Sequence, residues 1–295
     1  MDERSPLLRL AIQVDRDHAE LVLTELLELA PGGVEEVDVS DVLIEYAVYG
    51  APGELPSLPD LEAAAGGALV HVSTSEVAAD WAQRWREFHR PLVLGDRLTV
   101  RPPWEPAQGT ELDVVIDPGQ AFGTGAHATT RLCLELLLRE RGGGGRGGGG
   151  GRGGDELGEP APGAGRSCVD LGCGSGVLAI TAARLGFAPV IALDFDPAAV
   201  AATADNAAVN GVSLDVRRFD LRAEQAPDAD LVVANVLAAP LLSWAGLQVR
   251  LPPRLILSGL LVAETDRVAS AYAARGMTLV ETRADGDWAA LVLTR

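Results

Sequence analysis

Three alternating glycines constrain this chain more than any other feature. Residues 168–180 read Cys-Val-Asp-Leu-Gly-Cys-Gly-Ser-Gly-Val-Leu-Ala-Ile, an apolar run, then a glycine at every second position, then helix-forming residues. The pattern predicts a buried parallel strand, a tight turn and the start of a helix. Because Gly172 and Gly174 have no Cβ, a ligand can lie against bare backbone and the first N–H groups of the helix. An ordinary glycine-rich turn without a ligand is the alternative.

The spacing of these glycines indicates the class of ligand. A dinucleotide-binding turn reads G-x-G-x-x-G, and here Val177 occupies the third glycine position. A Walker loop needs G-K-[ST], and the chain contains no lysine. The pattern D-x-G-x-G-x-G from Asp170 to Gly176 instead resembles the first motif of the S-adenosylmethionine-dependent methyltransferases.

The C-terminal part of the chain alternates between strand and helix patterns. Strands are predicted at 167–171, 190–193, 214–218, 231–234, 255–258, 278–282 and 289–294, and helices at 177–185, 197–209 and 263–274. Asp196, followed by Pro197, is the expected cap of the second of these helices. The alternation predicts a doubly wound, Rossmann-like α/β domain, whose ligands lie at the carboxyl ends of the strands.

Two polar residues follow predicted strands of this sheet. Asp194 stands 22 residues beyond Gly172, close to where a carboxylate reaches ribose hydroxyls in nucleoside-binding folds. A carboxylate can accept two hydrogen bonds from a vicinal diol. Asn235 is placed to orient a methyl acceptor or the methionine end of the cofactor. A helix-capping acid is the alternative for Asp194, and a turn residue for Asn235.

The first 90 residues predict a separate, smaller unit. Strands are predicted at 7–14, 34–39, 42–49 and 68–73, with a helix from a cap at Asp17 to Leu29 and a short helix at 61–65. This order indicates a ferredoxin-like α+β domain over residues 1–72. Residues 73–90 are expected to form a linker helix whose aromatic stripe, Trp81, Trp85 and Phe88, packs at the domain junction.

The remaining residues, 91–295, are expected to form the larger domain. Its first strands are predicted at 91–101 and 112–116, followed by a long loop, 117–130, which has three glycines and an exposed Phe122. Such a loop suits a lid that folds over a bound ligand, the alternative being a purely structural loop. Thr129 or Thr130 is the expected cap of the helix 131–139.

Residues 142–165 form a biased segment between that helix and the next strand. They contain 14 glycines in 24 residues, which predicts a disordered, solvated linker rather than packed structure. Arg-Gly tracts can bind RNA, but Arg146 and Arg152 are the only charges within the glycine repeat.

Cysteine, histidine and hydropathy patterns exclude several classes of protein. Cys133, Cys168 and Cys173 form no C-x-x-C pair, and the four histidines are scattered, so neither a disulfide framework nor a metal site is expected. No apolar run approaches the ~18 residues of a membrane span. The N-terminal residues are acidic and lack the basic and then apolar segments of a signal peptide, which favours a cytoplasmic protein.

The net charge of −18 is unevenly distributed. Residues 1–72 hold 15 acids and 3 arginines, a net of −12, and the remainder carries −6. An acidic surface repels phosphate backbones, so direct nucleic-acid binding, and with it RNA methylation, is not expected. The same charge attracts a basic protein partner, unless it serves solubility alone.

Motifs spread along the chain resemble one bacterial family. They are Asp117-Pro118-Gly119-x-Ala121-Phe122-Gly123-Thr124-Gly125-x-His127-x-Thr129-Thr130, Asp170-x-Gly172-x-Gly174-Ser175-Gly176 and Ala234-Asn235-Val236-Leu237. Together they resemble the methyltransferases of ribosomal protein L-eleven (L11), over nearly the whole chain. The chain departs from that family in the length of the 142–165 insertion and in His89-Arg90, where a lysine is common.

The resemblance implies a protein methyltransferase that uses S-adenosylmethionine. It also implies that the small N-terminal module binds L11, and that the enzyme methylates lysine ε-amines and the N-terminal α-amine of L11. The cofactor contacts that the resemblance implies are Thr130, Gly172, Asp194 and Asn235. We add Gly174 from the turn and Phe122 as a cover, take Asn235 as the catalytic residue, and expect a monomer. The alternatives are a lysine methyltransferase for another protein and a non-catalytic cofactor-binding module in ribosome assembly.

Overall fold

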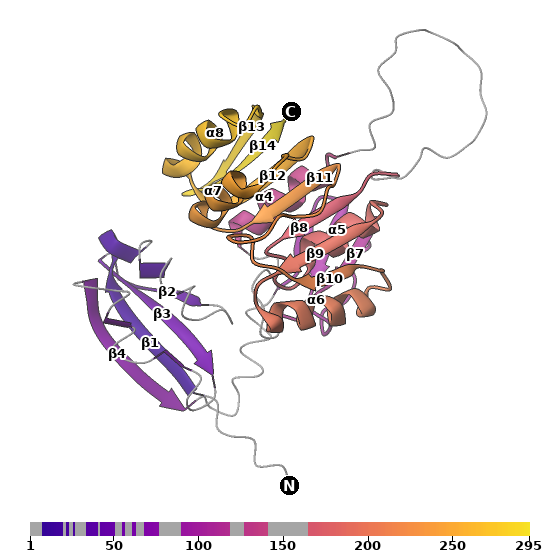
Figure 1. Cartoon of the computed structure of the whole chain (residues 1–295). Coiled ribbons are helices and arrows are strands. Elements are labelled where there is room, and N and C mark those ends of the chain that lie inside the picture. The colour runs from indigo at the N-terminus through magenta and orange to yellow at the C-terminus, as the bar shows by residue number, and fades with distance from the viewer. Residues whose placement is uncertain are drawn as a thin grey trace. The chain divides into compact units, whose positions relative to one another are not determined.

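A computed structural model describes residues 8–19, 22–23, 26, 34–40, 42–50, 55–56, 61–62, 68–76, 90–118, 127–140 and 165–295. They divide into two units, one within residues 1–88 and one built mainly from residues 89–118 and 123–295 (Figure 1). The borders expected at residues 72 and 90 stay a prediction. The aromatic stripe of the linker helix, Phe122 and nearly all of the glycine-rich insertion lie outside the described residues.

The smaller unit contains a four-stranded antiparallel sheet in the order β2-β3-β1-β4. The strands are β1 (Leu8–Asp15), β2 (Glu35–Ser40), β3 (Leu43–Gly50) and β4 (Leu69–Glu76). Alternation along β1 and β3 places Ile12 and Tyr46 on one face, where they pack with Val22 and Leu26 from the helical segment. This arrangement fits the predicted ferredoxin-like module, which stays a prediction.

Two details of this unit differ from expectation. Asp15, rather than Asp17, is the capping residue: its side chain accepts a hydrogen bond from the Asp17 N–H and begins the short 3₁₀ helix η1 (Arg16–His18). The cap precedes its expected position because β1 runs directly into the helical turn. β4 continues to Glu76, past residue 72, and so includes the first four residues of the expected linker helix, 73–76.

The larger unit is organised around a seven-stranded sheet in the order β10-β9-β8-β11-β12-β14-β13. The strands are β8 (Cys168–Leu171), β9 (Val190–Asp194), β10 (Asp215–Arg218), β11 (Leu231–Asn235), β12 (Arg254–Leu261), β13 (Thr278–Asp285) and β14 (Trp288–Thr294). All pairs are parallel except the two that involve β14. The chain winds outward in opposite directions from β8 and β11, which makes their junction the switch point where ligands bind.

Helices cover both faces of this sheet (Figure 1). They are α4 (Ala128–Leu137), α5 (Val177–Arg184), α6 (Pro197–Val209), α7 (Ala238–Leu247) and α8 (Thr265–Ala273). Successive residues of β11 point to opposite faces of the sheet. Leu231 and Val233 pack in one core with α4, α5 and α6. Val232 and Ala234 pack in a second core with Trp244 of α7 and Tyr272 of α8. The predicted doubly wound α/β fold is therefore confirmed.

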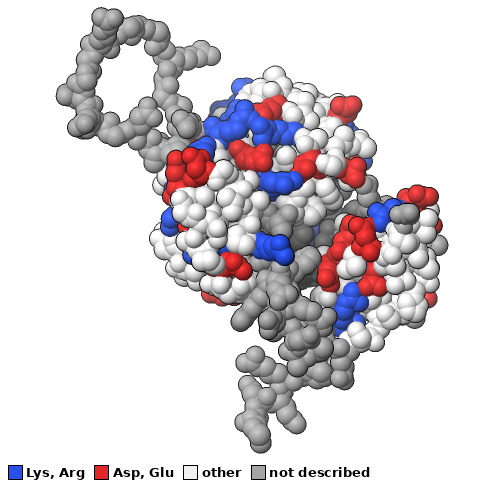
Figure 2. All heavy atoms as spheres, turned by 180° about the vertical axis from the view of Figure 1, so that it is seen from behind, with Lys and Arg blue, Asp and Glu red and all other residues white. Residues whose placement is uncertain are grey.

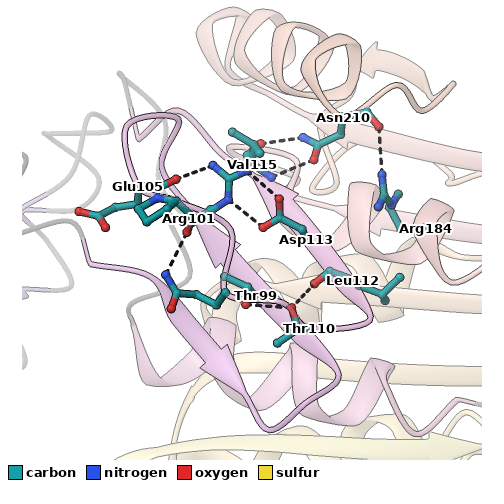
Figure 3. Close-up of polar contacts among 11 residues, drawn as sticks. Thr99, Arg101, Glu105, Thr110, Leu112, Asp113, Val115, Arg184 and Asn210 are labelled. Carbon is teal, nitrogen blue, oxygen red and sulfur yellow. Dashed lines mark hydrogen bonds and ion pairs between the residues drawn. The ribbon is translucent and has the colours of Figure 1, made fainter.

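A small sheet of β5 (Leu92–Leu94), β6 (Leu98–Arg101) and β7 (Leu112–Val115) packs against the first of these cores. The single strand expected over 91–101 is wrong, because a turn begins at Gly95, whose φ of +59° favours glycine. The Arg101 guanidinium donates to Asp113 at 2.8 and 2.7 Å and to the Glu105 carbonyl at 2.6 Å (Figure 3).

Of the helices in the described ranges, none is long and apolar enough to cross a bilayer.

Candidate active site

The three alternating glycines form a closely packed turn between β8 and α5. Gly172, Gly174 and Gly176 have φ angles of +71°, +54° and +83°, a region that side chains rarely adopt. A Cβ on Gly172 would lie 2.3 Å from Cγ1 of Val236. The Gly172 N–H donates to the Leu193 carbonyl at 2.8 Å. The backbone conformation and the packing therefore both require glycine at this point.

The register of the sheet places the predicted residues in one row. Leu171 pairs with Leu193 on one side and with Ala234 on the other. The residues that follow these three are Gly172, Asp194 and Asn235, so they lie next to one another at the carboxyl ends of β8, β9 and β11. This is the edge of the sheet at which the sequence predicts the ligand.

Asp194 holds the glycine turn through its carboxylate. Oδ2 accepts from the Gly174 N–H at 2.9 Å, and Oδ1 accepts from the Asp196 N–H at 3.0 Å. Asp196 is the cap of α6, since its side chain accepts from the Ala198 N–H, which excludes the capping alternative for Asp194. Burial raises the pKa of Asp194 above its usual range. Each oxygen keeps a further lone pair, which is what contact with a ribose requires.

Asn235 and Thr130 meet although 105 residues separate them. The Asn235 Nδ2 donates to Thr130 Oγ1 at 3.1 Å. Thr130 is fully buried in the first turn of α4. The structure thus brings together two of the residues that the sequence assigns to one site, as it does Gly172, Gly174 and Asp194.

The cap of α4 differs from expectation. It is His127, whose side chain accepts from the Thr129 N–H, so neither Thr129 nor Thr130 caps the helix. The His127 ring packs edge-on against Trp288, with the ring centroids 5.0 Å apart, and burial lowers the pKa of His127. A neutral imidazole keeps one nitrogen as an acceptor, which is what the capping bond needs. Contact with β14, distant in sequence, therefore decides the cap.

Asp170, the first residue of the glycine motif, is completely buried. Its Oδ2 accepts from the Ala179 N–H of α5 at 3.0 Å, so it caps that helix from the neighbouring strand. Oδ1 has no hydrogen-bond partner among the described residues. Burial, together with the nearby Asp194 charge, raises the pKa of Asp170 to about 7.

Replacing Asp170 by asparagine should flatten the pH dependence of stability. Because the pKa of Asp170 is about 7 when folded and ~3.9 when unfolded, the folded chain binds this proton more tightly. Its stabilising contribution is complete below the unfolded pKa and is lost as pH rises through the folded pKa. Between about pH 5 and about pH 8, the wild type should lose roughly 3 kcal/mol more unfolding free energy than Asp170→Asn. Urea unfolding across that range measures the difference, and parallel curves would contradict it.

Phe195 is a further candidate for the site that the sequence pattern did not single out. It directly follows Asp194, remains 48% exposed, and lies beneath the guanidinium carbons of Arg218 and Arg222, 5.0 and 5.4 Å from its ring centroid. An aromatic residue immediately after the strand-end acid was the available signal.

Among the described residues, no group of three or more His, Cys, Asp or Glu side chains could hold a metal ion.

Comparisons with known proteins agree on one family. Residues 58–295 match the family model described as Ribosomal protein L11 methyltransferase (PrmA). The chain is 39% identical over 219 residues to the Ribosomal protein L11 methyltransferase of Symbiobacterium thermophilum, a match covering 72% of this chain and 65% of the relative. It is 35% identical over 293 residues to that of Methylococcus capsulatus, covering 92% and 93%.

A solved structure supports the same relationship. It is described as ribosomal protein L11 methylase from Lactobacillus delbrueckii subsp. bulgaricus, and it matches with a TM-score of 0.55 at 26% identity. The match covers 70% of this chain and 99% of that one.

Proposed function

The chain belongs to the ribosomal protein L11 methyltransferase family, and we propose that it transfers methyl groups from S-adenosylmethionine to lysine ε-amines and the N-terminal α-amine of L11. The observation that carries this proposal is the row of Gly172, Asp194 and Asn235 at the switch point of the sheet, completed by Thr130. Bare backbone, a carboxylate and an amide on three neighbouring strands provide contacts for a nucleoside with an amino-acid tail.

The residues present fit S-adenosylmethionine. Gly172 presents backbone without a side chain directly beside Asp194 in the neighbouring strand, and the Asp194 oxygens have lone pairs available to a ribose diol. Phe195, which is 48% exposed next to Asp194 and is partly covered by Arg218 and Arg222, is the aromatic residue that we propose to pack against the adenine. We assign the cofactor to Gly172, Gly174, Asp194, Thr130 and Asn235, and Phe122 to its cover. When bound, the cofactor supplies the electrophilic sulfonium methyl.

The protein's part in the reaction is to position and desolvate the attacking amine. Because the Asn235 Nδ2 donates to Thr130, its Oδ1 is the atom that remains to accept a hydrogen bond from the amine. That bond would aim the nitrogen lone pair at the methyl group. A lysine amine has a pKa of ~10.4 in water. A desolvated site lowers this pKa, and we propose that the amine loses its proton to water before attack.

We propose that the smaller unit docks the basic substrate protein. Residues 1–72 carry a net charge of −12, and acidic groups gather on part of the face shown in Figure 2. Strand β2, at one end of its sheet, exposes Glu36 and Asp38 together with Val37 and Val39. Opposite charges steer association and are screened by salt.

The KM for L11 should therefore rise with ionic strength more than the KM for the cofactor.

We further propose that the enzyme acts in the cytoplasm as a monomer and makes no direct contact with nucleic acid. The net charge of −18 supports the last point, because an acidic surface repels phosphate groups. Ribosomal proteins supply the substrate in that compartment. Sedimentation of the purified chain, with and without L11, would test the oligomeric state.

A methyl-transfer assay tests the function. The purified chain is incubated with methyl-labelled S-adenosylmethionine and a total ribosomal-protein fraction, and mass spectrometry locates the label. We expect label on amines of L11, and Asn235→Ala should lower kcat by roughly a hundredfold because the amine is no longer aligned. Label on lysines of another protein would favour a different substrate. Cofactor binding without transfer would favour a non-catalytic module, and full turnover by Asn235→Ala would contradict the positioning role.

A further inference from the structure

One face of α6 holds the glycine turn from behind. Thr203 and Asn206 are one turn apart on α6 and almost completely buried. Thr203 Oγ1 donates to the Gly174 carbonyl at 2.9 Å, and the Asn206 Nδ2 donates to the Ser175 carbonyl at 2.9 Å. Two consecutive carbonyls of the turn are therefore fixed against α6 by side chains that the site described above does not include.

Asn206 also binds the chain that leaves β7. Its Oδ1 accepts from the Asp117 N–H at 3.0 Å, across 89 residues of sequence. Asp117 is the first residue of the loop motif Asp117–Thr130. A single amide, 3% exposed, thus joins the glycine turn to the start of that motif. Because water has little access, a bond that is lost here leaves a buried polar group without a partner.

Asn210, the C-cap residue of α6 and four residues beyond Asn206, provides an internal comparison. Its Oδ1 accepts from the Val115 N–H at 2.8 Å and its Nδ2 donates to the Val115 carbonyl at 2.6 Å (Figure 3). It is also buried and also holds the chain near the end of β7. The hydrogen bonds that the structure shows for Asn210 include none to the glycine turn.

We infer that Thr203 and Asn206 are positioning residues, which set the affinity for the cofactor by holding the carbonyls of the glycine turn. The carbonyls of Gly174 and Ser175 are held by α6, and the Gly174 N–H is held by the Asp194 carboxylate, so the turn is fixed from both sides at the strand end where the ligand is proposed to bind. Asn206 also fixes where the chain after β7 starts relative to the turn. The inference rests on the proposed use of S-adenosylmethionine.

Calorimetry with S-adenosylhomocysteine on the full-length chain tests the inference. Asn206→Asp keeps the size of the side chain but replaces the Nδ2 donor by an oxygen, which cannot donate to the Ser175 carbonyl. The dissociation constant for S-adenosylhomocysteine should therefore rise about tenfold or more. Thr203→Val removes the donor to Gly174 and should act in the same direction. Asn210→Asp is the matched control: it should lower the melting temperature comparably and leave the dissociation constant nearly unchanged.

The outcomes separate this inference from the proposed function. If the wild type does not bind S-adenosylhomocysteine, the proposed function fails. If the wild type binds and the Asn206 and Thr203 variants bind as tightly, or if Asn210→Asp weakens binding just as much, α6 is only structural and the inference is wrong. If Asn206→Asp does not fold, Thr203→Val measured against Asn210→Asp decides the question alone.

Discussion

Gly259→Ala is expected to lower the unfolding free energy by about 3 kcal/mol or more and to reduce methyl transfer at least a hundredfold. Gly259, in β12, has a φ of +81°, and a Cβ there would lie 2.6 to 2.8 Å from the O, C and N atoms of the Val236 backbone. The Val236 N–H donates to the Ser258 carbonyl at 3.1 Å. Backbone cannot move aside as a side-chain end can, so the chain directly after Asn235 must shift.

Gly276→Ala is the matched control for this prediction. Gly276 has a φ of +82°, almost equal to that of Gly259, and a Cβ there would meet nothing within 4 Å. The unfolding free energy of its alanine variant should fall only by the cost of a left-handed backbone at alanine, about 1 to 2 kcal/mol, and the variant should keep full activity. Urea unfolding and kcat/KM, measured on both variants, isolate the clash with Val236. Equal losses in the two variants would mean that the clash has no consequence.

The row of site residues could be predicted because it depends on local patterns. Buried parallel strands are short apolar runs, so the residues that end them, such as Asp194 and Asn235, can be recognised in a single sequence. Gly172 is recognisable because few residues adopt its backbone conformation. The sheet order could be expected only as a class. The pairing of Leu171 with both Leu193 and Ala234, which aligns the row, needed the structure.

The features that the sequence did not reveal depend on contacts distant in the chain. Usual capping preferences favour Thr129 or Thr130 over a histidine, yet His127 caps α4 while packed on Trp288. Asn206 lies on an alanine-rich helix whose pattern singles out no functional side chain, and its partner Asp117 is 89 residues away. Spacing rules for helices and strands cannot connect such pairs, because they describe neighbours within one element.

The turn at Gly95 was hidden for a different reason. Apolar residues on both sides, Leu92–Leu94 and Leu98–Arg101, continue the strand pattern across it. A three-residue reversal leaves only one strong signal, a glycine next to an aspartate, and that signal is common within loops. Short hairpins of this kind are therefore read as one long strand unless pairing is known.

Asp194→Ala is expected to weaken S-adenosylhomocysteine binding by roughly a hundredfold, measured by calorimetry. The variant loses the carboxylate proposed to bind the ribose and also the acceptor that holds the Gly174 N–H, and hydrogen bonds to a charged group contribute ~1.5–3 kcal/mol each. Because burial raises the pKa of Asp194, wild-type affinity should fall as pH decreases through that raised pKa, whereas the variant should show no such fall.

Asp196→Ala separates the ribose contact from simple loss of a nearby acid. Asp196 stands two residues away at the same strand end and caps α6 through the Ala198 N–H. Its loss should cost about 1 kcal/mol of stability and leave the cofactor affinity close to that of the wild type. If both alanine variants lose affinity alike, the carboxylate of Asp194 acts through the local fold of the strand end, and its assignment to the ribose is wrong.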